Sequence, residues 1–210
     1  MVTKQAQDAQ NGTSGKRAGG KPLATRANRL QALRTAYTKE AAICRWNNGV
    51  PMFGEGDDKD PRMCFVVLSP SQFDVERGKH FMSGRESVVF NDMLSSLGMT
   101  RADVYVTALC KWATPTHRIV ESPVAVRHAL THLTTELTLV NPRNVVLLGR
   151  RISEIFVPDI DLVREHGHVV EGNRWNYVPM YHPENALVNM DIAHAMLRNT
   201  AQLNHLVGKA

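Results

Sequence analysis

Four short strand-like segments, separated by stretches with helical periodicity, constrain most strongly what this chain can fold into. Residues 63–68 (MCFVVL) form a continuous apolar run, and comparable segments occur at 103–107, 144–148 and 177–181. Runs of this length are typical of strands buried on both faces, as in a parallel sheet. Their alternation with helices predicts an α/β fold, a three-layer αβα sandwich around a central, mainly parallel four-stranded sheet.

The intervening segments carry signals for where helices begin and end. Ser122 followed by Pro123 is an N-cap with proline at the first helical position, and Gly149 precedes another predicted helix. We also expect a helix over about 24–43 and another over about 191–206. A further predicted helix carries Val89, Met93, Leu94 and Leu97 on one face and ends at Gly98. In the helix after Pro123, apolar residues at helical spacing predict a buried stripe made of Val126, Leu130, Leu133 and Leu137.

In parallel sheets of this kind, ligands bind outside the carboxyl ends of the strands. Three predicted loops follow strands at that edge, at 69–84, 108–117 and 182–189. We therefore expect the functional residues in these three loops.

Composition and charge indicate the domain organisation, the kind of partner and the cellular compartment. Residues 1–22 are polar and basic, which predicts a disordered basic tail before a single domain at 23–210. The net charge of +5 and a pI near 9.3 allow an acidic partner such as DNA. No segment has the roughly 20 apolar residues of a membrane span. Three cysteines without a secretory signal predict a reducing, cytoplasmic compartment.

Several short motifs occur in a fixed order on these predicted elements. They are 53–56 (FGEG), 67–71 (VLSPS), 78–81 (GKHF), 105–111 (YVTALCK) and 181–187 (YHPENAL). Together they resemble the iron–sulfur branch, families four and five, of the uracil-DNA glycosylase superfamily. The resemblance extends from Cys44 to the C-terminal helix. It implies a DNA glycosylase that flips its target base out of the helix, and we expect a monomer that acts on nucleoid DNA.

The resemblance implies roles for an aromatic ring and a histidine. Phe81 matches the residue that stacks on the flipped base, although a Phe at this position is also compatible with a core side chain. His182, placed at a strand end before Pro183, matches the residue that stabilises charge on the departing base.

Other positions depart from the family pattern. The family-four acid falls on Leu68, beside Ser69, and the amide that reads uracil falls on Ala108. An Arg common in the family's last loop falls on Val188. The water-activating carboxylate must then come from elsewhere, and the candidates are Asp74, Glu86 and Glu184.

Further residues near these loops are candidates for contact with DNA. They are Lys111, Trp112, Arg118 and Asn185. Basic side chains grip phosphates and an indole stacks on bases, but Trp112 equally fits a role in closing the core.

The iron–sulfur ligand set is incomplete, since family members supply four cysteines. Cys44 and Cys110 match two positions, whereas Asn47 and His128 occupy the other two. Cys64 lies in a predicted buried strand. We therefore expect no cofactor, with Cys44, Cys110 and His128 as remnants of a cluster site, and an iron–sulfur cluster bound by an incomplete ligand set is the alternative. The pairs His166/His168 and His128/His132 have metal-ligand spacing, but solvated or capping roles explain them better.

These observations predict an enzyme that hydrolyses the N-glycosidic bond of a flipped base and leaves an abasic site. Loss of polar readers at Ala108 and Val188 extends the expected substrates from uracil to modified pyrimidines, such as the hydroxymethylated or glucosylated cytosines of phage DNA. The small side chain at Ala108 is also expected to admit a bulkier base. The alternatives are a catalytically degenerate DNA-binding protein and, with less support, a metal-dependent nuclease.

Overall fold

A computed structural model describes residues 25–40, 50–81, 84–114 and 121–207. Part of the sequence-based prediction therefore lies outside the described residues, namely the tail at 1–22, Cys44, Asn47 and Arg118. No helix within the described ranges is long and apolar enough to cross a membrane.

The described residues form one six-stranded sheet in the order β1-β3-β2-β4-β6-β5. The strands are β1 (Glu55–Gly56), β2 (Met63–Val67), β3 (Val104–Ala108), β4 (Asn144–Leu148), β5 (Val170–Glu171) and β6 (Asn176–Met180). The four predicted strands are β2, β3, β4 and β6, and they pair in parallel. The prediction of four strands missed β1 and β5, two-residue antiparallel strands at the edges that are too short to show a pattern.

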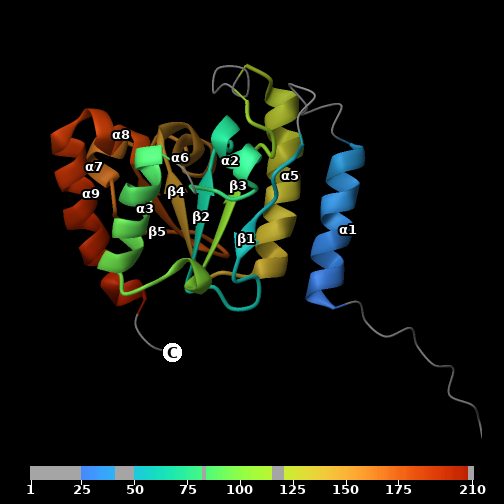
Figure 1. Cartoon of the computed structure of the whole chain (residues 1–210), viewed down its shortest axis with the longest axis horizontal. Coiled ribbons are helices and arrows are strands. Elements are labelled where there is room, and N and C mark those ends of the chain that lie inside the picture. The colour runs from blue at the N-terminus through green and yellow to red at the C-terminus, as the bar shows by residue number, and fades with distance from the viewer. Residues whose placement is uncertain (1–24, 41–49, 82–83, 115–120, 208–210) are drawn as a thin grey trace, which may run out of the picture.

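Helices cover both faces of the sheet, so the predicted three-layer αβα arrangement is confirmed (Figure 1). One face carries α3 (Gly84–Ser96), α8 (Pro183–Val188) and α9 (Met190–Gln202), and the other carries α5 (Pro123–Val140) and α6 (Arg150–Phe156). α1 (Arg26–Lys39) packs outside α5 through Leu30 and Tyr37. The remaining helical segments are α2 (Gln72–Arg77), α7 (Leu162–Glu165), η1 (Arg101–Asp103) and η2 (Leu203–Leu206).

The strands alternate their side chains between two apolar clusters. In β2, Cys64 and Val66 join the cluster under α5, whereas Met63, Phe65 and Val67 join the cluster under α3. Because successive side chains of a strand point to opposite faces, a continuously apolar strand fills both layers. The core therefore holds the carboxyl ends of the strands at one edge, where the predicted loops converge.

The helix signals at 122 and 149 are confirmed. The Ser122 hydroxyl accepts a hydrogen bond from the Ala125 backbone N–H, and Gly149, at φ +111°, precedes α6. The predicted stripe on α5 is shifted, since Leu133 and Leu137 are buried with Ala125 and Ala129, whereas Val126 and Leu130 are only partly buried.

The loop predicted at 69–84 contains a helix, α2, that the sequence reading missed. Ser71 and Asp74 form a reciprocal capping box: the Ser71 hydroxyl accepts from the Asp74 N–H at 3.1 Å, and the Asp74 Oδ2 accepts from the Ser71 N–H at 3.1 Å. The S-x-x-D spacing of these residues is the sequence signal for such a helix start.

Candidate active site

A cavity of about 670 Å³ lies at the carboxyl ends of β2, β4 and β6. Its walls contain eight of the residues singled out by the sequence: Leu68, Ser69, Asp74, Phe81, Glu86, His182, Glu184 and Asn185. Thr114 from the loop after β3, and Arg150 and Arg151 from the start of α6, add further polar groups to its lining. The volume falls within the range of small-molecule sites.

Backbone hydrogen bonds tie the loops at this edge together. The N–H groups of Leu109 and Cys110 donate to the carbonyls of Val67 and Leu68, each at 2.9 Å. The Ser69 hydroxyl donates to the Thr114 carbonyl at 3.1 Å. The wall of the cavity after β2 is thus braced by the loop after β3.

Phe81 is held in an uncommon backbone conformation on the cavity wall. Its φ of +50° is in the left-handed region, which non-glycine residues adopt only when surrounding structure enforces it. Arg101 enforces it by donating hydrogen bonds to the carbonyls of His80 and Phe81. The Phe81 ring stacks on Phe90, with ring centroids 4.6 Å apart, and lies 5.6 Å from the His182 ring. Only 3% of Phe81 is exposed, so it belongs to the core and to the cavity wall at once.

His182 is the N-cap of α8, and this position determines the arrangement of its ring. The Nδ1 atom accepts a hydrogen bond from the Glu184 backbone N–H at 3.3 Å. A neutral ring whose Nδ1 accepts must carry its proton on Nε2. Burial lowers the pKa of His182, against the opposing charges of Glu184 and Asp74, and so favours this neutral form.

The end of β6 is supported from behind by a second histidine. The Nδ1 atom of His166 accepts from the Tyr181 N–H at 3.2 Å, and the His166 and Tyr181 rings lie 4.6 Å apart. Burial lowers the pKa of His166 to about 4. His168 is exposed, so the structure does not join the pair 166/168 into a ligand set.

Three carboxylates line the same cavity. Asp74 is 5% exposed, and its Oδ2 atom accepts the Ser71 N–H in the capping box of α2. Glu86, in the first turn of α3, is partly buried, and within the described residues its carboxylate has no hydrogen-bond partner. Burial raises the pKa of Glu86, and the negative charges of Glu184 and Asp74 raise it further.

A sequence model of the "Uracil DNA glycosylase superfamily" matches residues 53–203 of this chain, a range that includes the whole cavity. The chain belongs to this superfamily. The expectation of a DNA glycosylase is thereby confirmed at the level of the family.

Curated relatives in the superfamily match most of the chain. The "Type-4 uracil-DNA glycosylase" of Archaeoglobus fulgidus is 28% identical over 171 residues, which cover 77% of this chain and 83% of the relative. Proteins of the same name from Saccharolobus solfataricus and Thermotoga maritima are each 28% identical, over 154 and 142 residues. These alignments cover 69% and 65% of this chain, and 69% and 71% of the respective relatives.

The residues of this superfamily member do not fit a four-cysteine iron–sulfur cluster. The chain has three cysteines, of which Cys64 is buried inside β2. Cys110 is buried beside Trp112 and Thr114, and its Sγ lies 3.5 Å from the Trp112 carbonyl oxygen and 3.5 Å from the Thr114 hydroxyl. His128 lies against Glu40 and His132 and is not grouped with Cys110. Within the described ranges, no complete cluster ligand set exists.

Three further predictions need correction, because their side chains lie away from the cavity. Lys111 was predicted to bind DNA, but it is 2% exposed and its Nζ lies 2.6 Å from Glu136 Oε2. Trp112 is 1% exposed and stacks on Tyr37 in the core, the alternative role that the sequence left open. Ala108 is buried at the end of β3 and does not line the cavity, so a smaller residue there does not enlarge it.

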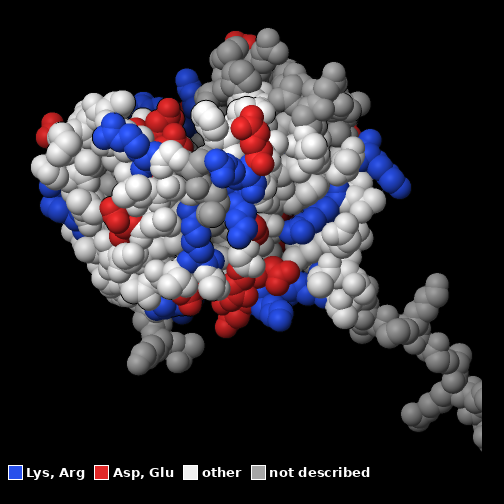
Figure 2. Space-filling model, in the orientation of Figure 1, with Lys and Arg blue, Asp and Glu red and all other residues white. Residues whose placement is uncertain are grey.

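The sequence reading missed Arg150 and Arg151, which follow Gly149 at the cavity wall. The signal was available, since two arginines come directly after the third predicted strand, at the edge where ligands bind. On the face shown in Figure 2, basic and acidic side chains alternate, so the net charge does not form one uniformly basic surface there.

Proposed function

We propose that this chain hydrolyses the N-glycosidic bond of uracil in DNA and leaves an abasic site. The observation that carries the proposal is the convergence of His182, Phe81 and three carboxylates in one cavity at the carboxyl ends of the strands. Membership in the superfamily and the printed names of the relatives support the same activity.

His182 supplies the hydrogen-bond donor to the departing base. Cleavage leaves negative charge on the base, and a fixed donor aimed at that charge lowers the barrier. Because Nδ1 is occupied by the Glu184 N–H, the Nε2–H is the donor that remains for a carbonyl oxygen of uracil. A neutral imidazole can donate there without delivering its proton.

The carboxylates act on the sugar side of the bond. Positive charge develops on the sugar as the base leaves, and nearby carboxylates stabilise it. Glu86 is the best placed to orient the attacking water, because its carboxylate makes no hydrogen bond within the described residues, whereas Asp74 already caps α2. Glu184 is more exposed and contributes mainly through its charge.

The remaining cavity residues position the DNA. Phe81 offers an aromatic surface for the flipped base. Arg150 and Arg151 contact phosphates, and Ser69 and Asn185 lie beside the base. We extend the proposal to an enzyme that acts as a monomer on DNA of the cytoplasmic nucleoid.

A modified pyrimidine is a second candidate substrate, favoured by one observation. Leu68 lines the cavity where the resemblance predicts an acid, so this part of the wall is apolar and uncharged. A hydroxymethylated or glucosylated cytosine of phage DNA is the candidate base, and its excision would serve defence against phages.

The test compares two labelled DNAs, one containing uracil and one containing modified cytosines, followed by alkali treatment. We expect strand breaks in uracil DNA only after alkali, since a nuclease would break strands without it. His182→Ala should lower the single-turnover rate by about 10²–10³-fold, whereas the exposed His194→Ala should not change it. Unchanged turnover in His182→Ala would reject the assigned role. DNA binding without excision by the wild-type chain would favour the catalytically degenerate binding protein.

A further inference from the structure

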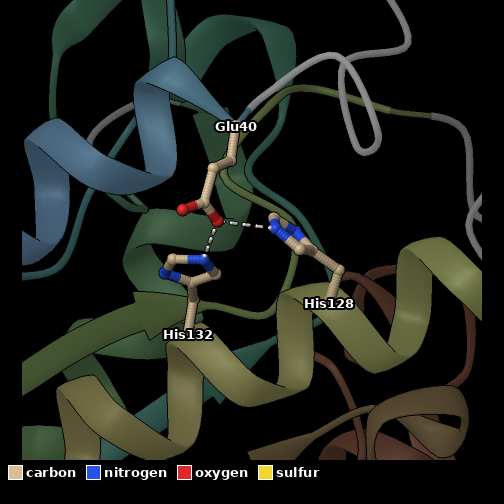
Figure 3. A group of neighbouring side chains, drawn as sticks. All are labelled: Glu40, His128 and His132. Atoms are coloured by element: carbon tan, nitrogen blue, oxygen red, sulfur yellow. Dashed lines mark hydrogen bonds and ion pairs between the residues drawn. The ribbon is translucent and has the colours of Figure 1, made fainter.

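A second group of histidines and a carboxylate lies outside the cavity, where α1 meets α5. His128 and His132 are one turn apart on α5, and Glu40 is the C-cap residue of α1 (Figure 3). The Nε2 atoms of His128 and His132 lie 2.9 and 3.0 Å from the same Glu40 oxygen, Oε2. Glu40 is 88 residues from His128 and 92 residues from His132 in the sequence, so only the fold brings it to the two histidines.

The types of ligand atom and their spacing suit a transition-metal ion. The potential ligand atoms of the three residues all lie within 4.8 Å of one another. Two imidazole nitrogens and a carboxylate oxygen form a recurring ligand set for zinc, with water in the fourth position. Ligands about 2.0–2.1 Å from a tetrahedral zinc are about 3.3 Å from each other, so small side-chain movements would convert the present arrangement into a coordination shell.

Tyr37 orients the two imidazoles, and the exposed Glu40 side chain leaves the group accessible to an ion from solvent. Tyr37 contacts both imidazoles, with ring centroids 5.7 Å from His128 and 4.5 Å from His132. The histidine side chains are 18% and 13% exposed, whereas the Glu40 side chain is 53% exposed. An ion can therefore enter from the Glu40 side and keep a water ligand. The C-terminal end of α1 adds the partial negative charge of the helix dipole, which favours a cation.

We propose that Glu40, His128 and His132 form a site for one divalent transition-metal ion of the zinc type. The ion would fasten the C-terminal end of α1 to α5, in a structural role separate from base excision. None of the three residues lines the catalytic cavity. The ligand atoms are nitrogen and oxygen, so the site differs in chemistry from a thiolate-bound iron–sulfur cluster.

The first test titrates Zn²⁺ into the full chain after treatment with EDTA, using calorimetry and metal analysis after gel filtration. We expect one equivalent of Zn²⁺ in the wild type. The affinity should fall by about tenfold or more in Glu40→Gln, His128→Ala and His132→Ala. His194→Ala, which removes an exposed histidine on α9, is the matched control and should bind as the wild type does.

Two further measurements protect this test from a folding artefact. Far-UV circular dichroism of the metal-free variants establishes whether they fold. If a histidine variant does not fold, the comparison depends on Glu40→Gln, because Glu40 is the most exposed of the three side chains. The midpoint of thermal unfolding should rise with Zn²⁺ in the wild type and not in the three variants. Uracil excision by His128→Ala should match the wild type, which separates this proposal from the proposed function.

Three results would overturn the proposal. The first is a wild-type chain that retains less than one equivalent of Zn²⁺. The second is equal affinity in the wild type and in all three variants. The third is Zn²⁺ binding that is abolished by Cys44→Ser but kept when the histidines are replaced, since the ion would then be held elsewhere.

Discussion

The cavity and the polar network around Lys111 both follow the ends of parallel strands, yet they use their polar groups in opposite ways. In the network, Lys111 Nζ donates to Thr107, to the Ala108 carbonyl and to Glu136, at 2.6–2.7 Å. Glu136 also accepts from the Tyr105 hydroxyl at 2.7 Å. In the cavity, the His182 Nε2 and the Glu86 carboxylate have no hydrogen-bond partner within the described residues.

The difference distinguishes a structural site from a binding site. Burial by itself would raise the pKa of Glu136, but the charge and hydrogen bonds of Lys111, with the hydroxyls of Tyr105 and Thr107, lower it. Buried charges persist only when they are paired in this way. In the cavity, the His182 Nε2 and the Glu86 carboxylate keep their hydrogen-bonding capacity. Under the proposed function, polar residues of similar type therefore serve recognition in the cavity and stability in the network.

The largest expected effect comes from breaking the network. Glu136→Ala should cost about 3–5 kcal/mol of unfolding free energy, because it leaves the Lys111 ammonium buried and unpaired. Urea unfolding measures this loss, and the excision rate of the folded fraction should not change. Glu154→Ala removes an exposed pair with Arg151 and should cost no more than about 1 kcal/mol.

A double replacement sharpens the same prediction. Lys111→Met with Glu136→Leu removes both charges and should recover most of the stability lost in Glu136→Ala. If the double variant folds well but loses excision of uracil, the network takes part in catalysis and the contrast with the cavity fails.

A smaller effect is expected from the aromatic wall of the cavity. Phe81→Ala should lower kcat/KM for uracil DNA by about 10–100-fold, because base stacking contributes about 1–3 kcal/mol. The rate is measured well below the unfolding midpoint and corrected for the folded fraction. Phe73→Ala is the control, since Phe73 lies on α2, is 67% exposed and does not line the cavity.

Phe81→Leu separates stacking from packing, because it keeps an apolar side chain beside Phe90. A Phe81→Ala variant that loses stability while its corrected kcat/KM stays at the wild-type value would make Phe81 a core residue only.

The smallest expected effect is a shift in pH dependence. As the proposed water-orienting group, Glu86 must be ionised, so excision should fall as the pH drops through its raised pKa. Glu184→Gln removes a negative charge that raises the pKa of Glu86, so the acidic limb of the kcat/KM profile should move to lower pH. A profile that stays in place, or moves to higher pH, would contradict the role of Glu86. Glu171→Gln, an exposed position on β5, is the control.

Much of the fold could be predicted because its signals are local. The four apolar strands, the cap at Ser122 and the turn at Gly149 each depend on a few consecutive residues. The capping box of Ser71 and Asp74 was equally readable but was overlooked. The two-residue strands β1 and β5 carry no pattern, because they form only by pairing with β3 and β6.

For the site, the sequence by itself determined which loops meet, since parallel strands bring their carboxyl ends to one edge. That rule placed His182, Phe81, Asp74 and Glu184 correctly on one cavity, whereas Glu86 lies outside the three loops, in the first turn of α3. Only the tertiary structure decided which way each side chain turns. Lys111 turns inward because Glu136, 25 residues later, offers a buried partner, and His128 and His132 meet Glu40 because α1 packs against α5. Such contacts depend on packing between distant segments, which no local pattern of residues records.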